Sequence, residues 1–456
     1  MSEVVKTNSA QISEKENPII SGPIWKQLLY FFFPILFGSL FQQMYNTVDA
    51  IIVGQFVGKA ALAAVGGSTN FLISFLINLF TGISSGATVI IAQLYGAKRF
   101  EDVHKTVHTS MAMTLIAGIG IMILGFFFSK PALLLMGTPE DILDYATIYM
   151  QIYFLGSIPS FIYNIGSGIL RAVGDNKRPL YFLIAACITN IILDIIFVVL
   201  LNLEVAGAAL ATIASQLVAA ILVIWVLVKE KGVHRLEIKS IKLDIPFVKD
   251  ILKVGIPTGL QSNMYTISNI CLQASINSFG TNTIAAWTAF TKIDNFYWMV
   301  CGAFGIAITT FVGQNYGAGK MERVRKSVKI CLTMTFAASV LLSIIFITFA
   351  KPLLSIFTND TEVLRLAVQV AQLYCPFYVC YVCIEILSGV IRGSGNSVMP
   401  MVLTCLGVCV LRIAWVFLLL PKFHIFEMII ISYPVSWTVC SIMFVIYYLK
   451  CNWLRQ

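Results

Sequence analysis

The chain alternates between long apolar runs and short polar segments along its whole length. Twelve apolar runs are each long enough to cross the roughly 30 Å hydrocarbon core of a bilayer as an α-helix. They cover residues 27–53, 60–95, 104–128, 141–170, 178–200, 205–228, 247–277, 282–316, 327–349, 362–391, 399–420 and 427–449, each with edges good to several residues. The pattern predicts an all-α integral membrane protein with twelve transmembrane helices.

The second half of the sequence repeats the first half at an offset of 221 residues from about residue 84 onward. The motif Gln93–Ala97 recurs as Gln314–Ala318, and Lys130-Pro131 recurs as Lys351-Pro352. Each half holds six runs, so the chain returns to the same side of the membrane between the halves. The sequence therefore predicts two six-helix lobes related by a parallel internal repeat, a design typical of transporters that work by alternating access.

The composition supports a membrane location, because 58% of the residues are hydrophobic and 12% are charged, against roughly 25% charged residues in soluble domains. The predicted cytosolic segments hold 24 of the 31 Lys and Arg residues. The opposite side holds five, and Lys292 and Arg412 fall within spans. This asymmetry predicts a multi-pass protein of the plasma membrane with both termini in the cytosol. It also accounts for the net charge of +9 without nucleic-acid binding.

These features divide the chain into five predicted segments. They are a disordered cytosolic tail (1–23), an N-terminal lobe (24–228), a basic cytosolic linker (229–250), a C-terminal lobe (251–449) and a cytosolic tail (450–456). We also expect His104 and His108 to lie in a solvated basic loop. Pro34 and Pro257 occupy similar positions in the two halves, and each removes a backbone donor, which invites a bend in its helix.

Polar residues inside the spans of the N-terminal lobe are candidates for function, because a charge at the bilayer centre costs on the order of 3 kcal/mol. Asp49 and Asp194 are the acids well inside these spans, and the spans contain no buried Lys or Arg to neutralise them. Amides and hydroxyls surround them in the sequence, namely Gln42, Gln43, Asn46, Asn190 and Thr212. Asn190 and Asp194 are four residues apart and share a helix face. We interpret the two acids as a site that exchanges protons or holds a sodium ion, with a structural role as the alternative.

The C-terminal lobe carries buried charges of both signs. Lys292 lies near Asp294 in one span, while Glu385 and Arg412 lie in two others. One interpretation is that they form internal ion pairs. The other is that Asp294 or Glu385 faces the cleft between the lobes and attracts cationic substrates.

Several classes of protein lack support in the sequence. There is no Walker loop, no Gly-x-Gly-x-x-Gly motif and no His-Glu-x-x-His motif. No nucleophile, base and metal ligands converge at one depth, so we expect no enzyme activity and no cofactor. A channel is disfavoured because the acids are distributed unequally between the halves, and a selectivity filter needs a ring of equivalent groups.

The sequence resembles the multidrug and toxic compound extrusion (MATE) family over residues 24–449. The resemblance rests on Pro34 with Asn46–Asp49, Gln93–Ala97, Leu170–Asp175 and the repetition of these motifs in the second half. It implies a monomeric bacterial antiporter that exports amphipathic, often cationic drugs or toxic metabolites in exchange for H⁺ or Na⁺. By resemblance, the coupling ion binds at Asp49, Asn190, Asp194 and Thr212, while Gln42, Asn46, Asp294 and Glu385 are candidates for the substrate cleft.

The resemblance also has departures. Span 7 lacks the acidic residue of some family members, and Glu385 lies about one turn from the usual position of the acid in helix 10. This favours the DinF-like and NorM-like bacterial branch and leaves the coupling ion open between H⁺ and Na⁺. A flippase for lipid-linked saccharides, from the same superfamily, is the alternative function. Such proteins usually have fourteen helices and a basic cleft.

Overall fold

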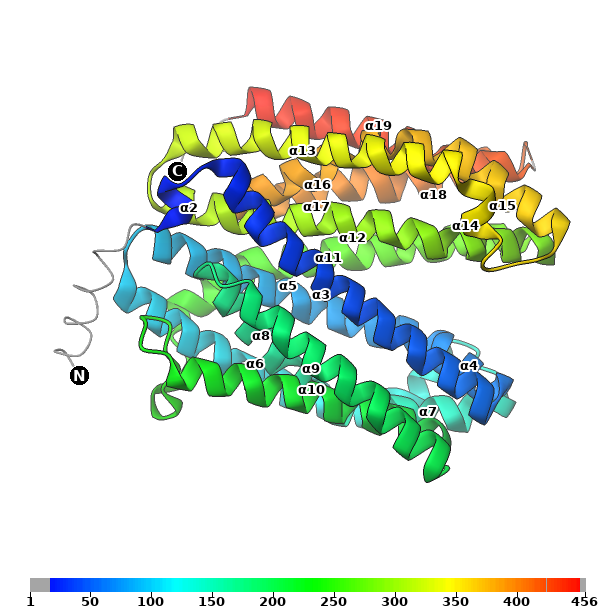
Figure 1. The fold of residues 1–456 in the computed structure, drawn as a ribbon, viewed down its shortest axis with the longest axis horizontal. Coiled ribbons are helices and arrows are strands. Elements are labelled where there is room, and N and C mark those ends of the chain that lie inside the picture. The colour runs from blue at the N-terminus through cyan, green and yellow to red at the C-terminus, as the bar shows by residue number, and fades with distance from the viewer. Residues whose placement is uncertain (1–16, 424, 452–456) are drawn as a thin grey trace. The chain divides into compact units, whose positions relative to one another are not determined.

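The computed structural model describes residues 17–423 and 425–451, and within them it contains helices and turns but no strands (Figure 1). The first nine α-helices of the described chain are α2 (Pro18–Ser21), α3 (Ile24–Ile52), α4 (Lys59–Gly66), α5 (Ser68–Gly96), α6 (Phe100–Leu135), α7 (Glu140–Leu155), α8 (Ser157–Ala172), α9 (Lys177–Asp194) and α10 (Glu204–Lys229). The remaining α-helices are α11 (Ile245–Asn277), α12 (Thr281–Gly317), α13 (Met321–Thr348), α14 (Ala350–Leu354), α15 (Thr361–Tyr374), α16 (Tyr378–Gly393), α17 (Val398–Thr404), α18 (Leu411–Leu418) and α19 (Phe426–Lys450).

Short segments of other helical geometry join or extend these helices. Three are π-helical turns, η1 (Val53–Val57), η2 (Ile195–Leu200) and η5 (Cys405–Val410). Two are 3-10 turns, η3 (Ile238–Ser240) and η4 (Cys375–Phe377). Within the described chain, ten helical stretches are apolar and long enough to cross a membrane. The α7–α8 pair, broken at Gly156, and α11 complete the twelve predicted spans. The predicted all-α architecture is therefore confirmed.

The helices form two compact units. One unit contains α2 and Phe33–Gly259, and the other contains Gly22–Phe32 and the chain from Leu260 onward. Helices α3 and α11 each contribute residues to both units. The boundary between the units falls just before Pro34 in α3 and two residues after Pro257 in α11. Both prolines lie inside helices that continue past them. The bend that each proline invites does not interrupt either helix.

The internal repeat is visible in the backbone conformation. Residues with positive φ recur in matching turns, at Lys98 and Gly319 and again at Gly174 and Gly395. Each of these pairs is separated by the 221 residues of the sequence repeat. The amide N–H of Arg99 donates to the carbonyl of Leu94 at 3.0 Å, just as that of Lys320 donates to Asn315 at 2.9 Å. The two halves therefore leave their second long helix through the same turn.

Small residues allow helices to cross closely at matching points of the two units. A Cβ atom at Gly168 would lie 2.4 Å from Thr88 Oγ1 on α5. At the repeated position, a Cβ atom at Gly389 would lie 2.9 Å from both Gly305 O and Thr309 Oγ1 on α12. These contacts are shorter than side chains tolerate, so only glycine permits the α5–α8 and α12–α16 crossings.

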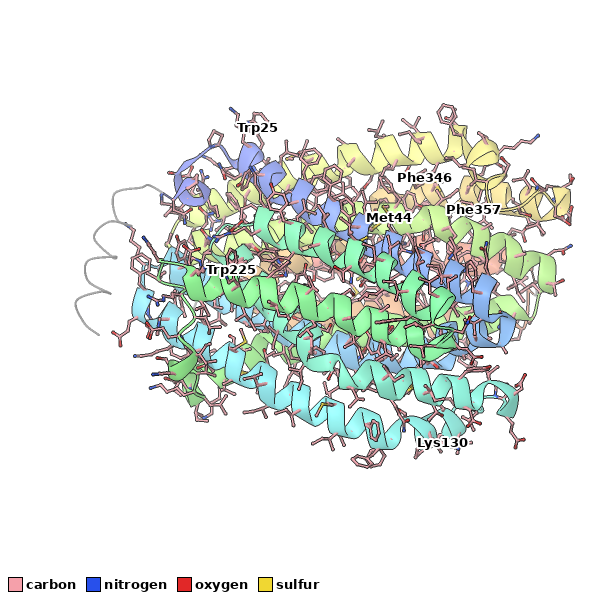
Figure 2. The ribbon with its side chains drawn as sticks, turned by 60° about the horizontal axis from the view of Figure 1, so that its bottom comes forward. Trp25, Met44, Lys130, Trp225, Phe346 and Phe357 are labelled. Atoms are coloured by element: carbon pink, nitrogen blue, oxygen red, sulfur yellow. The ribbon has the colours of Figure 1, made fainter. Side chains whose placement is uncertain are left out.

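The outer faces of the helices are apolar, as a protein surrounded by lipid requires. Large side chains on the helices remain about half exposed, for example Trp25 (50%), Met44 (53%) and Trp225 (55%) (Figure 2). The Lys229 ammonium lies 4.3 Å from the centre of the Trp225 ring. An amphipathic ring with a cation at a helix end is typical of a membrane–water interface.

The segment between α10 and α11 is held against the N-terminal unit. Glu237 N–H donates to His108 Nε2 at 2.9 Å, and Asp244 N–H donates to Thr109 Oγ1 at 3.3 Å. Both His104 and His108 lie on α6, and the side chain of His108 is buried. The expectation of a solvated loop is wrong because His108 accepts a backbone hydrogen bond from the linker. At the N-terminus, residues 18–21 form α2 rather than part of a disordered tail, and residues 1–16 and 452–456 lie outside the described residues.

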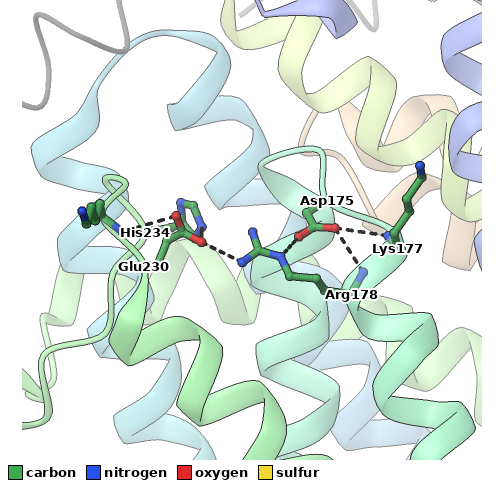
Figure 3. Close-up of polar contacts among 6 residues, drawn as sticks. Asp175, Lys177, Arg178, Glu230 and His234 are labelled. Carbon is green, nitrogen blue, oxygen red and sulfur yellow. Dashed lines mark hydrogen bonds and ion pairs between the residues drawn. The ribbon is translucent and has the colours of Figure 1, made fainter.

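One guanidinium joins the start of α9 to the end of α10 (Figure 3). Arg178 Nη1 donates to Glu230 Oε2 at 2.8 Å, and Arg178 Nε donates to Asp175. Asp175 Oδ1 also accepts the backbone N–H groups of Lys177 and Arg178, so it caps the first turn of α9. His234 Nε2 lies 3.8 Å from Glu230 Oε2.

This group makes the stability of the N-terminal unit depend on pH. Burial lowers the pKa of His234, and the charge of Glu230 offsets that effect only in part. Burial alone would raise the pKa of Glu230, but the hydrogen bond from Arg178 and the nearby positive charges hold it below its usual range. Since folding favours neutral His234, its contribution is present above the unfolded pKa of roughly 6.5 and is lost as the pH falls below that value. The contribution of Glu230 is lost at lower pH, as the pH falls through its folded pKa.

We expect the His234→Gln variant to have a flatter dependence of melting temperature on pH than the wild type between pH 7.5 and 5.5. Glutamine cannot take up a proton in this range, so the penalty for protonating a buried ring disappears. The measurement is the melting temperature of purified protein across that range. Arg235→Gln, at the exposed neighbouring position, serves as the control and should keep the wild-type slope. Parallel profiles for wild type and His234→Gln would contradict the assignment.

Candidate functional site

The polar residues predicted from the N-terminal half come together in one place. Asp49 lies in the last turn of α3, and Asp194 is the last residue of α9. Each is followed by a π-helical turn, η1 after Asp49 and η2 after Asp194, and the two turns pack against each other. Single π-helical turns widen a helix locally and are frequent at functional sites. This pairing of turns could not be predicted from the apolar pattern.

Four side chains from three helices form the resulting cluster. Asn190, Asp194 and Thr212 lie beside the Asp49 carboxylate. Asn190 and Asp194 are fully buried, Thr212 is 8% exposed, and Asp49 is partly buried. The sequence analysis named these four residues, and the structure brings all four together.

The hydrogen bonds leave most oxygen atoms of the cluster without partners. The Thr212 hydroxyl has two acceptors within reach, the Ala208 carbonyl at 3.0 Å and Asp49 Oδ2 at 3.4 Å. Buried polar atoms that lack a hydrogen-bond partner of good geometry include Asp49 Oδ1, Asn190 Oδ1 and both carboxylate oxygens of Asp194. Such atoms are rare in folded proteins, because desolvation without a partner costs about 1–3 kcal/mol per group. The cluster therefore has unused acceptor atoms for a shared proton or for a cation.

Gln42 and Asn46 lie on α3, about two turns and one turn before Asp49, respectively. Both side chains are exposed, and no hydrogen bond joins either of them to the four-residue cluster. The structure therefore separates them from the ion-binding candidates. They remain candidates for contact with substrate.

The ion pairs expected in the C-terminal half do not form. Asp294 Oδ2 accepts a hydrogen bond from Trp298 Nε1 and Oδ1 accepts one from the Tyr378 hydroxyl, both at 2.7 Å. Among the described residues, no cation lies within 4 Å of Asp294, and Lys292 has no ion-pair partner. The Asp294 carboxylate therefore takes its hydrogen bonds from two neutral aromatic side chains and not from Lys292.

Glu385 and Arg412 are also separate. Glu385 Oε2 accepts a hydrogen bond from the Tyr381 hydroxyl at 3.1 Å, and the cation that influences it is Arg392. No ion pair between Glu385 and Arg412 exists in the part of the chain that the structure describes. A Cβ atom at Gly305 would lie 2.1 Å from Glu385 Oε1, so this glycine provides the space for the carboxylate. The ion-pair interpretation of Glu385 with Arg412 is therefore wrong.

A polar network that sequence reasoning missed surrounds Arg392. Arg392 Nη2 donates to Gln261 Oε1 at 3.1 Å and to Ser388 Oγ at 3.3 Å. Gln261 Nε2 in turn donates to Thr404 Oγ1 at 2.9 Å. The internal repeat pointed to Arg392 alone, because Arg171 and Arg392 occupy equivalent positions in the two halves. The contacts across α11, α16 and α17 could not be read from spacing.

Comparison with known proteins places the chain in a family. The MatE family model matches residues 34–196 and again residues 257–418, so each half is matched separately. The probable multidrug resistance protein YoeA of Bacillus subtilis is 27% identical over 445 residues, which is 95% of each chain. A FAD transporter of Shewanella oneidensis is 26% identical over 79% of this chain and 80% of its own.

The fold agrees with solved structures of the same kind. A MOP superfamily transporter from Pyrococcus furiosus superposes with a TM-score of 0.90 at 22% identity, covering 97% of this chain and 99% of the other. This likeness confirms the predicted fold of two six-helix lobes with an internal repeat. Since the family model covers well over half of the residues, the chain belongs to the MatE family, the multidrug and toxic compound extrusion transporters.

Proposed function

We propose that this protein is a secondary active efflux antiporter that exports amphipathic, often cationic small molecules in exchange for H⁺ or Na⁺. The observation that carries the proposal is the buried cluster of Asp49, Asn190, Asp194 and Thr212 with its unpartnered oxygens. Two adjacent carboxylates in a low-dielectric site cannot both stay ionised unless a proton or a cation lies between them. Binding and release of that ion is the step that drives transport.

The donor set of the cluster suits one shared ion. Carboxylate, amide carbonyl and hydroxyl oxygens are the ligands that hard cations prefer. Thr212 Oγ1 lies 3.0 Å from the Ala208 carbonyl and 3.4 Å from Asp49 Oδ2, so its lone pairs can face an ion when the hydroxyl donates to Ala208. An ion held between both acids makes each acid necessary. Two independent proton sites would instead leave partial activity when either acid is removed.

The proposal also includes the substrate class, the membrane location and the oligomeric state. Relatives named as a multidrug resistance protein and as a FAD transporter support small organic molecules as substrates. The distribution of Lys and Arg supports a plasma-membrane location with both termini in the cytosol. Gln42, Asn46, Asp294 and Glu385 are proposed to contact substrate, and the protein is proposed to act as a monomer without a cofactor.

The energetics define what the exchange can achieve. One elementary charge that crosses a potential of 100 mV supplies about 2.3 kcal/mol. A tenfold concentration gradient requires about 1.4 kcal/mol, so one charge supports roughly a 50-fold gradient of a neutral substrate. Exchange of one monovalent cationic drug for one H⁺ or Na⁺ moves no net charge. We therefore expect such exchange to follow the chemical ion gradient and to ignore the membrane potential.

The test is efflux of a fluorescent cationic dye from proteoliposomes that contain the purified protein. A pH gradient, a Na⁺ gradient and a membrane potential are imposed one at a time. We expect one of the two ion gradients to drive efflux and the potential alone to have no effect. Efflux driven by neither gradient would refute the proposed antiport, and efflux driven by potential alone would refute one-for-one exchange.

A further inference from the structure

A cavity of about 480 Å³ lies inside the C-terminal unit. This size falls in the range of roughly 300–1,000 Å³ that is typical of sites for drug-sized ligands. Six aromatic side chains form much of its wall, among them Trp287, Trp298 and Tyr433. Two charged side chains, Asp294 and Arg412, also line it. The ion-coupling cluster is not part of this cavity.

Arg412 is the unusual member of the wall. Its side chain is 2% exposed, and its guanidinium carbon lies 4.2 Å from the centre of the Tyr433 ring and 5.8 Å from that of Trp437. Its Nε donates to Ser436 Oγ at 2.9 Å. Among the described residues, neither of its two terminal nitrogens has a hydrogen-bond acceptor, and no carboxylate lies within 4 Å. The two rings and Ser436 hold the guanidinium in place and leave its terminal donors unused.

A guanidinium in this state is suited to a carboxylate. Two parallel N–H groups match the two oxygens of a carboxylate, and the charged hydrogen bonds that result are roughly twice as strong as neutral ones. Burial strengthens this preference, because water does not compete well inside a protein. Among the described residues no carboxylate takes this place, so the partner that fits is part of a ligand.

Asp294 provides the opposite charge in the same cavity. Trp298 and Tyr378 each give its carboxylate one hydrogen bond, but neither donor carries a positive charge. Asp294 and Arg412 do not pair with each other, so they are separated by more than 4 Å. A ligand with both charges, spaced apart on a flat ring system, would satisfy both residues and the aromatic wall together.

We propose that this cavity binds planar aromatic zwitterions, with the ligand carboxylate held by Arg412 and the cationic part directed to Asp294. The proposal rests on the proposed efflux function, and it narrows the substrate class. It differs from a simple cation site, because a carboxylate on the ligand strengthens binding rather than weakening it.

The experiment compares two dyes that differ in one group. Rhodamine 110 carries a free carboxylate, and rhodamine 123 is its methyl ester, which keeps the ring system and the positive charge. Binding of each dye to the purified full-length protein is measured by fluorescence polarisation without an ion gradient. We expect the wild type to bind rhodamine 110 at least about tenfold more tightly than rhodamine 123, as one charged hydrogen-bond pair provides.

Two variants of Arg412 and one control variant test whether Arg412 causes the preference for the acid. Arg412→Gln should bind both dyes equally, and Arg412→Lys should keep part of the preference, because it retains the charge but loses the paired donors. Lys422→Gln removes an exposed positive charge from the same unit and should keep the full preference. If Arg412→Gln does not fold, the comparison of the two dyes on the wild type still decides the question. Equal binding of the acid and the ester by the wild type would overturn the proposal.

The two proposals fail in different ways. Binding without a gradient does not involve the coupling ion. A protein that prefers rhodamine 110 but shows no gradient-driven efflux would refute antiport and leave the zwitterion site standing. A protein that exports cationic dyes but binds acid and ester equally would refute the zwitterion site alone.

Discussion

Replacement of Asp194 by Asn is expected to reduce gradient-driven efflux to the rate of passive leakage. The carboxylate is fully buried beside Asp49, and both of its oxygens lack hydrogen-bond partners. Asparagine keeps the shape but removes the exchangeable charge. We expect the same loss for Asp49→Asn, because one ion shared by both acids needs both of them. Initial rates of dye efflux in proteoliposomes measure the effect.

The Asp194→Asn protein is also expected to remain folded. Removal of a buried carboxylate without an ionic partner relieves a desolvation penalty, so its melting temperature should equal or exceed that of the wild type. Asp144→Asn is the matched control, since this acid on α7 has a side chain that is 87% exposed. Native efflux in either cluster variant, or collapse of its fold, would contradict the assignment.

The same variants can identify the ion. A ligand that binds the folded state alone stabilises it by about 2.7 kcal/mol at a concentration 100 times its dissociation constant. If the ion is Na⁺, then Na⁺ at constant ionic strength should raise the melting temperature of the wild type but not of Asp194→Asn. Choline chloride supplies the ionic-strength control. If the ion is H⁺, Na⁺ should have no effect on either protein.

Replacement of Gly82 by Ala is expected to destabilise the N-terminal unit strongly. A Cβ atom at this position would lie 2.3 Å from the backbone nitrogen of Gly259 and 2.5 Å from its Cα. The obstacle is backbone on α11, so no side chain can rotate away. Overpacking of this kind costs about 1–3 kcal/mol or more, and we expect the upper end or beyond. Thermal unfolding and the yield of monodisperse protein provide the measurement.

Gly120→Ala is the control for this prediction. Gly120 lies on α6, and a Cβ atom there would meet nothing within 4 Å. Alanine favours a helix interior by about 1 kcal/mol over glycine, so this variant should be neutral or more stable. Similar melting temperatures for the Gly82 and Gly120 variants would show that α5 and α11 do not cross as closely as described.

The sequence was most informative where a local pattern determines the structure. Apolar runs of bilayer length predicted the helices, and the offset of 221 predicted the duplicated halves. Burial of unpaired acids identified Asp49 and Asp194 before any contact was known. A polar residue in an apolar run is informative by itself, because the bilayer penalises every unsatisfied polar group.

The sequence was least informative where the outcome depends on which helices are neighbours. Lys292 and Asp294 are close in sequence, yet Asp294 finds its donors at Trp298 and at Tyr378, 84 residues away. Arg412 was matched with Glu385 by charge alone, whereas it stacks on Tyr433 and Trp437. Rings that serve as donors or as stacking surfaces look like ordinary core residues in a sequence. Charge complementarity therefore overestimated the ion pairs.

The matching left-handed turns at Gly174 and Gly395 fix how the two halves should be aligned. Twenty residues beyond each glycine stand Asp194 in the first half and Trp415 in the second. Trp415 donates its indole N–H to the Met428 carbonyl at 2.9 Å, which is a packing role rather than an ionic one. Duplication thus preserved the steric frame while the two copies specialised. The equivalent position is the proposed ion ligand in one copy and a packing residue in the other, so we expect that an acid grafted onto Trp415 would not create a second coupling site.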